Sequence, residues 1–353
     1  MESSSQKGFS AAYFAFLFSG LCFFSLPTQA ESFAGSVIIH IATIAASFAM
    51  LALLVFLKNR TDSFGNVGEN SLFSVFCFIL CGFVFAYFTK KFSGGLSEIS
   101  EQFNGALFSH FFVILSILLA LYAEKSGVRS YFAVCIVTLP MLLFPFVLTF
   151  FDFLDFSFFS ELEKAAVFSI SFDIRLVPDA FLSCAGWSVL VFLSKANKKC
   201  KKGVAVAFFV FALAVFLEGA KYLLWFGAKN LALISRPDRV MLAQVPSINV
   251  QDLYIFSYYL SFMIKIMLFT FAGRRFIEGV SEKIPPLMTY ILCGISFYGF
   301  YLFVPDKYAK VSACVCLALL YLCFLAKYLT KIIKFGKDGT NDIKKTISDS
   351  GKG

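Results

Sequence analysis

Long apolar runs separated by short polar stretches make up most of this chain. Each run is close to the roughly 20 residues that an α-helix needs to cross the hydrocarbon core of a bilayer. The pattern therefore predicts an all-α integral membrane protein with a single polytopic domain of about ten transmembrane helices. The predicted spans are residues 9–27, 33–57, 71–89, 104–123, 129–152, 178–194, 204–226, 250–273, 285–304 and 309–333.

The composition excludes a soluble protein of the same length. A chain of 353 residues would ordinarily form two soluble domains. Here 59% of the residues are apolar and only 15% are charged, against about 25% charged residues in soluble domains. The mean hydropathy is +0.80. A soluble fold has too little interior to bury that much apolar surface.

Lysine and arginine predict the orientation of the spans. An even number of spans places both termini on the same side of the membrane. With the termini inside, the inner loops and tail carry about twice as many Lys and Arg as the outer loops, as the positive-inside rule requires. Five lysines between Lys195 and Lys202 contribute most, and the acidic segment 152–173 falls outside. We therefore expect both termini to be cytoplasmic.

The two ends of the chain suggest further features. Lys7, an apolar core and Thr28-Gln29-Ala30 before Glu31 imitate a cleavable signal peptide, and cleavage there would leave nine spans. The alternative that we favour keeps this segment as the first span. Residues 336–353 are rich in Lys, Asp and Gly without periodicity, which predicts a disordered cytoplasmic tail.

Two spans carry small residues at mid-membrane depth. The first span contains Gly20 and ends at Pro27, which cannot donate a backbone hydrogen bond, and the sixth contains Gly186. Backbone released from a helix inside a membrane is tolerated only where it lines a cavity or is buried in protein. We therefore predict discontinuous helices one and six. The alternative is that both glycines only allow helices to pack closely.

Helices one and six are corresponding members of two five-helix halves. Paired interruptions at corresponding positions indicate a central binding site in transporter-like chains. Free amide groups and helix N-termini there would favour a carboxylate. The predicted ligand-binding residues are Gly20, Leu21, Cys22, Phe23, Phe24, Ser183, Cys184, Ala185, Gly186 and Trp187.

Charged residues inside spans are candidates for coupling or structural roles, because each costs about 2.5–3.5 kcal/mol on insertion scales. Glu218 and Lys221 are one helical turn apart and are expected to neutralise each other in part. Lys265 lies deep in the eighth span, and Asp252 lies near the start of that span. The two histidines, His40 and His110, are interpreted as packing residues.

No motif for catalysis, metal binding or a cofactor is present. The ten cysteines form no C-x-x-C pair, and there is no H-E-x-x-H or G-x-S-x-G sequence. We expect neither an enzyme nor a cofactor. The net charge of +9 is interpreted as loop charge with attraction to anionic membrane lipid, not as a nucleic-acid surface.

The stretch Ser19–Pro27 (SGLCFFSLP), followed by Ala30-Glu31 and Ala34-Gly35, resembles the opening of spore-germination permeases. These are the B subunits of GerA-type nutrient receptors, in the amino acid–polyamine–organocation (APC) superfamily. The resemblance covers residues 9 to about 335. Other similar features follow in the same order: the turn 122–128, the fifth span with Pro140 and Pro145, the acidic 152–155, Arg236-Pro237, and Val250-Gln251-Asp252 before Lys265.

The resemblance implies a five-plus-five inverted repeat with a pocket between helices one, three, six, eight and ten. It also implies an A-type membrane subunit and a C-type lipoprotein as partners, in the inner membrane of a bacterial spore. Three positions depart from the family pattern. Cys22 replaces a Gly, Trp187 stands where Glu is frequent, and Val250 replaces an Arg, so the ligand chemistry is expected to differ.

These features lead to three functional hypotheses. The first is a subunit that senses a nutrient, such as an amino acid, for a spore germination receptor. The second is an ion-coupled amino acid transporter, because one fold can serve both functions. The third is a scaffold whose pocket is filled by Trp187.

Overall fold

The computed structural model describes residues 11–20, 33–61, 71–99, 106–125, 128–151, 177–186, 189, 201–231, 240, 250–280 and 285–350. Nearly all of these residues are helical, and none of them is in a strand. The helices are Ala11–Gly20 (the N-terminal helix), α2 Phe33–Thr61, α3 Ser71–Ile99, α4 Ala106–Lys125, α5 Val128–Phe151, α7 Val177–Ala185, α9 Lys201–Leu231, α11 Val250–Val280, α12 Pro286–Phe303 and α13 Asp306–Ser350.

The protein is an α-helical integral membrane protein. Within the described residues, six helices are long and apolar enough to cross a bilayer, in α2, α3, α5, α9, α11 and α13. The N-terminal helix, α4 and α12 contain shorter apolar segments. A described helix overlaps each of the ten predicted ranges. The total of ten spans and the inverted repeat stay predictions.

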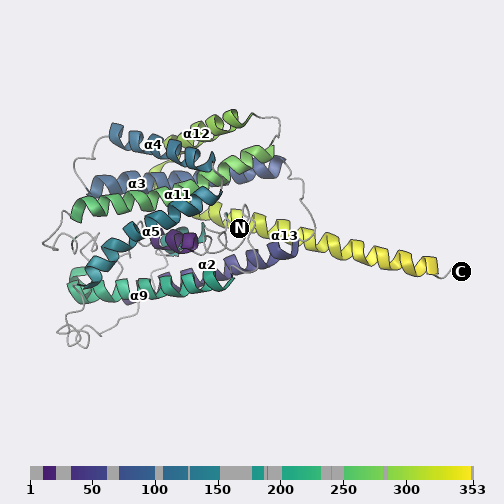
Figure 1. Ribbon diagram of the computed structural model, residues 1–353, viewed down its shortest axis with the longest axis horizontal. Helices are drawn as coiled ribbons and strands as arrows, with labels where there is room; N and C mark the ends of the chain where they lie inside the picture. Colours follow the sequence, from purple (N-terminus) through teal and green to yellow (C-terminus); the bar gives the residue numbers. More distant parts are fainter. Residues whose placement is uncertain are drawn as a thin grey trace.

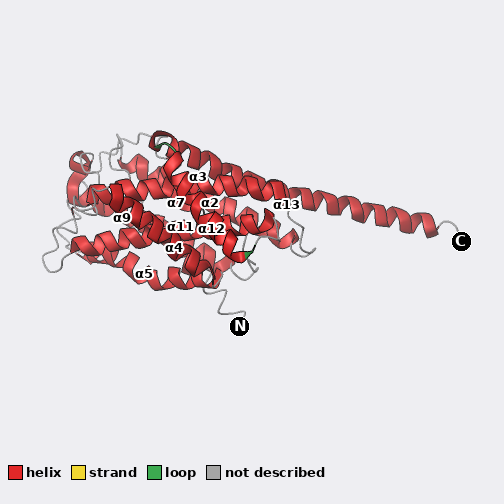
Figure 2. Cartoon of the chain, turned by 90° about the horizontal axis from the view of Figure 1, so that it is seen from above, coloured by secondary structure: helices red, strands yellow, loops and turns green. Residues whose placement is uncertain are grey.

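The C-terminal region differs from the prediction. Residues 336–353 are predicted to be disordered, whereas α13 is helical as far as Ser350 and extends well beyond the bundle (Figures 1 and 2). The physical reason is that the apolar part of α13 has already nucleated the helix. Each further residue then adds a backbone hydrogen bond without a new nucleation cost. Gly336 and Gly339 are the weak helix formers in this extension.

Helix α11 lies at the centre of the bundle. Every residue from Ser261 to Gly273 is buried, so this helix is covered on all faces. Helix α3 packs along it, and Figure 1 shows the two side by side. Stacked rings join them: Phe92 lies 3.9 Å from Phe262, and Phe88 lies 5.5 Å from Phe269, between ring centroids. Part of the large phenylalanine content therefore forms the contact between the two central helices.

The other helices form outer layers. Helices α4 and α12 lie on one side of the α3–α11 pair, and α2 and α9 lie on the other (Figure 1). Large apolar side chains point outward from these layers, including Leu118, Phe209 and Phe303. A soluble monomer rarely exposes so much apolar surface, whereas a bilayer would cover it.

Candidate ligand site between the N-terminal helix, α7 and α11

The two glycines singled out in the sequence lie where the N-terminal helix meets α7. An ideal Cβ on Gly20 would lie 3.1 Å from both the Cβ and the carbonyl oxygen of Ser183. A Cβ on Gly186 would lie 3.0 Å from Phe16 Cζ and 3.2 Å from Phe269 Cζ. Both glycines therefore lie at close contacts between helices. Whether they also interrupt helices one and six stays a prediction.

Helix α7 is short and ends inside the bundle. It runs for nine residues, from Val177 to Ala185, and Gly186 lies in the turn that follows. The Gly186 carbonyl accepts a hydrogen bond of 3.2 Å from the amide of Val189. The last carbonyl groups of a helix have no partner further along the helix. Ser183 belongs to this last turn, where a donor from outside the helix can reach a carbonyl.

Lys265 of α11 supplies that donor. Its Nζ donates to the Ser183 carbonyl at 2.5 Å and to the Phe16 carbonyl at 2.9 Å. The same ammonium lies 3.5 Å from the centroid of the Phe16 ring. It would be 3.4 Å from a Cβ on Gly20. One cation thus connects three helices that are far apart in the sequence.

The charge of Lys265 is only partly compensated. The side chain is 0% exposed, and no carboxylate among the described residues lies within ion-pairing distance of it. Two carbonyl dipoles, the negative end of α7 and an aromatic face all stabilise a cation. Removing an ammonium from water still costs several kcal/mol. An ammonium has three donors, and the two carbonyls use two of them.

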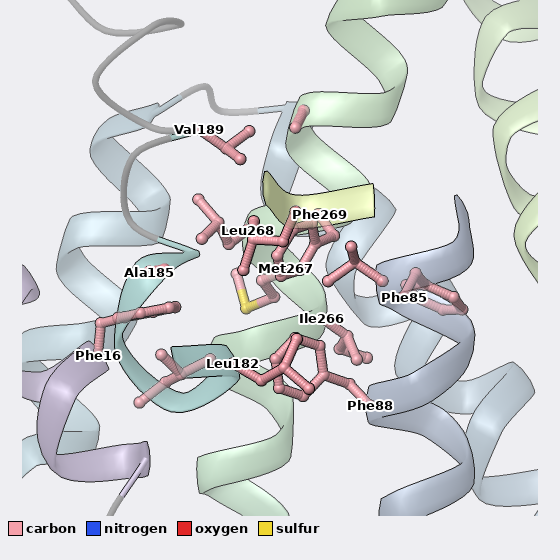
Figure 3. Packing of buried hydrophobic residues seen from close by; sticks show 14 of the residues in the cluster. Phe16, Phe85, Phe88, Leu182, Ala185, Val189, Ile266, Met267, Leu268 and Phe269 are labelled. Atoms are coloured by element: carbon pink, nitrogen blue, oxygen red, sulfur yellow. The ribbon is translucent and has the colours of Figure 1, made fainter. Parts of the chain in front are cut away.

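Apolar side chains pack where the N-terminal helix, α7 and α11 meet. Figure 3 shows Phe16 from the N-terminal helix and Leu182 and Ala185 from α7 gathered with Ile266 and Phe269 of α11. All five are buried. Such surroundings exclude water and lower the local dielectric constant, which strengthens the attraction between the ammonium and any nearby anion.

The structure describes only part of the predicted binding set. It brings together Gly20, Ser183, Cys184, Ala185 and Gly186, and Ser183 Oγ lies 3.1 Å from Cys184 Sγ. The predicted breaks in helices one and six extend into residues that the structure does not describe, and they stay predictions. The other predicted ligand-binding residues also lie outside the described residues: Leu21, Cys22, Phe23, Phe24 and Trp187.

Of the remaining predicted charges, Asp252 lies away from this centre. Asp252 is in the first turn of α11, 13 residues before Lys265, which is ~20 Å along the helix axis. Glu218 and Lys221 form a buried ion pair on α9 with an Nζ–Oε2 distance of 2.5 Å. Lys221 also lies 5.3 Å from the centroid of the Phe146 ring.

The histidines take part in packing. His110 Nδ1 is 3.3 Å from the Tyr298 hydroxyl oxygen, and its imidazole ring meets the Tyr301 ring edge-on. His40 is buried in α2. Within the described residues, the contacts of Lys265 are with Phe16 and Ser183 and not with either histidine.

Sequence reasoning missed two features. Phe16 provides both a carbonyl and a ring face to Lys265, but nothing distinguishes it among 49 phenylalanines except its position one turn before Gly20. The second is a polar cluster at the start of α7. There Asp179 accepts a hydrogen bond from Lys310 at 2.5 Å and from the Tyr87 hydroxyl at 3.2 Å. These contacts tie α7 to α13 and α3.

The fold and the site together define the class of protein: a helical membrane protein with a buried cation where three helices meet. No family model matches the chain, and no curated protein matches it.

Proposed function

We propose that this protein binds a small carboxylate-bearing nutrient, such as an amino acid, at Lys265. The observation that carries the proposal is the fully buried Lys265 ammonium, which has carbonyl partners but no carboxylate partner among the described residues. A ligand carboxylate would supply the missing countercharge. Charge-assisted hydrogen bonds of this kind are about twice as strong as neutral ones.

The position of Lys265 supports a sensing role. A ligand held there would touch the N-terminal helix, α7 and α11 at once, so its binding energy would depend on how these helices are arranged. A ligand that binds one arrangement more tightly shifts the population toward it. The sensor therefore needs no chemistry of its own.

The resemblance to spore-germination permeases makes the proposal more specific. On this basis the chain is the nutrient-sensing subunit of a germination receptor in the spore inner membrane. An A-type membrane subunit and a C-type lipoprotein would be its partners and would respond to the change in helix arrangement. The support for this step is the motif order in residues 9 to about 335.

Thermal unfolding of the purified full-length protein in detergent tests the binding step. An amino acid that binds should stabilise the folded protein by about 2.7 kcal/mol at a concentration of 100 times its Kd, and so raise the apparent Tm. The matching amines, which have no carboxylate, should leave the Tm unchanged. Lys265→Met keeps the length of the side chain but removes the charge, so it should abolish the shift. Lys307→Met, on an exposed lysine in the first turn of α13, is the control that should keep it.

A Lys265→Met protein that still responds to the same amino acid would refute the proposed carboxylate site. The biological step needs a second experiment. Spores of the host that lack the gene should fail to germinate with one nutrient and respond normally to others. Normal germination with every nutrient would exclude the receptor function.

The buried Glu218–Lys221 pair favours a second candidate, an ion-coupled amino acid transporter. Ionisable residues buried in a membrane commonly mark proton or ion pathways. In proteoliposomes this candidate predicts amino acid uptake that stops when the ion gradient is removed. It also predicts that Glu218→Gln uncouples uptake from the gradient.

A further inference from the structure

A groove with a volume of about 560 Å³ runs between α4 and α12 on the outer face of the bundle. Its walls include Ile114 and Leu118 of α4 and Ile295 of α12, and all three side chains are exposed. From Ile114 to Lys125 the groove follows α4 for 11 residues, which is ~16 Å. Half the thickness of the hydrocarbon core is about 15 Å. The groove therefore matches the depth of one leaflet.

A glycine hollows the floor of the groove. Gly294 of α12 lies against α4, and an ideal Cβ there would be 3.3 Å from Leu121 Cδ1 and 3.7 Å from Ile117 Cγ2. The two helices thus approach closely along their inner faces. Their larger side chains rise on either side of the contact, and these side chains form the rims of the groove.

One end of the groove is basic. Lys125, in the last turn of α4, lines this end together with Tyr290. The Arg274 guanidinium carbon lies 4.1 Å from the centroid of the Tyr290 ring, and the neighbouring Arg275 is half exposed. Glu278 pairs with both arginines. Among the described residues, Lys125 is the basic side chain that lines this end, and Arg274 lies behind the Tyr290 ring.

The opposite end has a different character. Tyr298 lines it, and its hydroxyl lies 3.3 Å from His110 Nδ1. The groove thus combines an apolar trough with the Lys125 ammonium at one end. The loop after Lys125 is also one that the distribution of Lys and Arg predicts to be cytoplasmic.

We propose that an anionic phospholipid occupies this groove. Its acyl chain lies along Ile114, Leu118 and Ile295, and its phosphate binds the Lys125 ammonium. Charge complementarity at one end favours an anionic headgroup over a zwitterionic one. The length favours a lipid over a partner transmembrane helix, because such a helix would follow the groove for the full ~30 Å of the hydrocarbon core.

Native mass spectrometry of the full-length protein in detergent tests the proposal. The probes are phosphatidylglycerol and phosphatidylcholine with identical acyl chains. The wild type should retain one phosphatidylglycerol about five-fold more often than phosphatidylcholine, as expected for one lysine near the headgroup. Lys125→Gln should abolish this preference, so that the two lipids are retained about equally. Lys307→Gln, the matched control, should keep it.

A second variant tests the apolar part of the groove. Leu118 is exposed, so Leu118→Trp adds bulk to the groove without entering the core. It should lower the retention of both lipids and leave the Tm in lipid-free detergent unchanged. Equal retention of the two lipids by the wild type would overturn the proposal. An unchanged preference in Lys125→Gln or unchanged lipid retention in Leu118→Trp would also overturn it. A wild-type dimer without bound lipid would overturn it too, because a second copy of the chain would then cover the groove.

Discussion

A methyl group at Gly20 tests whether the N-terminal helix and α7 must touch. An ideal Cβ at Gly20 would lie 3.1 Å from two atoms of Ser183 and 3.4 Å from Lys265 Nζ, whereas ordinary contacts of this kind begin at 3.4 Å. The neighbouring backbone must therefore move by a few tenths of an ångström. Overpacking of this kind typically costs ~1–3 kcal/mol.

Gly299→Ala is the matched control. Gly299 lies in α12, and a Cβ there would meet no atom within 4 Å. Because both glycines are helical, the gain of ~0.5–1 kcal/mol for replacing Gly by Ala is common to both variants and cancels in the comparison. Gly20→Ala is therefore expected to be ~1–3 kcal/mol less stable than Gly299→Ala.

The assay is thermal unfolding in one detergent at one lipid content. With roughly 2 °C per kcal/mol for a chain of this size, the apparent Tm of Gly20→Ala should be about 2–6 °C below that of Gly299→Ala. The ligand-induced shift should fall as well, because moving Ser183 disturbs the carbonyl that holds Lys265. Equal Tm values for the two variants would refute the close contact between the N-terminal helix and α7.

Two further predictions concern the stability of the bundle. Glu218→Gln or Lys221→Met alone should destabilise the protein by about 3–5 kcal/mol, because each leaves a buried charge unpaired, and the double variant should recover most of the loss in the same Tm assay. Single variants no worse than the double one would contradict this. Phe92→Ala should cost ~3–5 kcal/mol, since the Phe92 ring is buried and stacks on Phe262, while Phe209→Ala on the outer face should change the Tm little. A similar loss from both phenylalanine variants would argue against the α3–α11 contact as a major source of stability.

Much of the candidate site could be selected from the sequence because small residues and charges are rare within apolar runs. Gly20, Gly186 and Lys265 stand out for this reason. The contacts of Lys265 with Phe16 and Ser183 could not be deduced, since 249 and 82 residues of sequence separate the partners. Nothing local to α11 indicates which helix its lysine will reach.

The groove between α4 and α12 was not indicated by the sequence at all. Ile114, Leu118 and Ile295 look like ordinary lipid-facing residues in an apolar run. They form a trough only because Gly294 brings the two helices together and leaves the rims apart. The basic end likewise depends on α11 placing Arg274 beneath Tyr290.

The sequence by itself determined the class of the protein and the positions of its helices. In a bilayer the backbone must satisfy its own hydrogen bonds, so apolar runs of this length become helices wherever they occur. It also determined the Glu218–Lys221 pair, because residues three apart share one helix face. The tertiary structure alone decided which helices meet, and hence the partners of Lys265, the phenylalanine stacks and the groove. Those contacts depend on the shapes of side chains from distant segments, and hydropathy does not encode them.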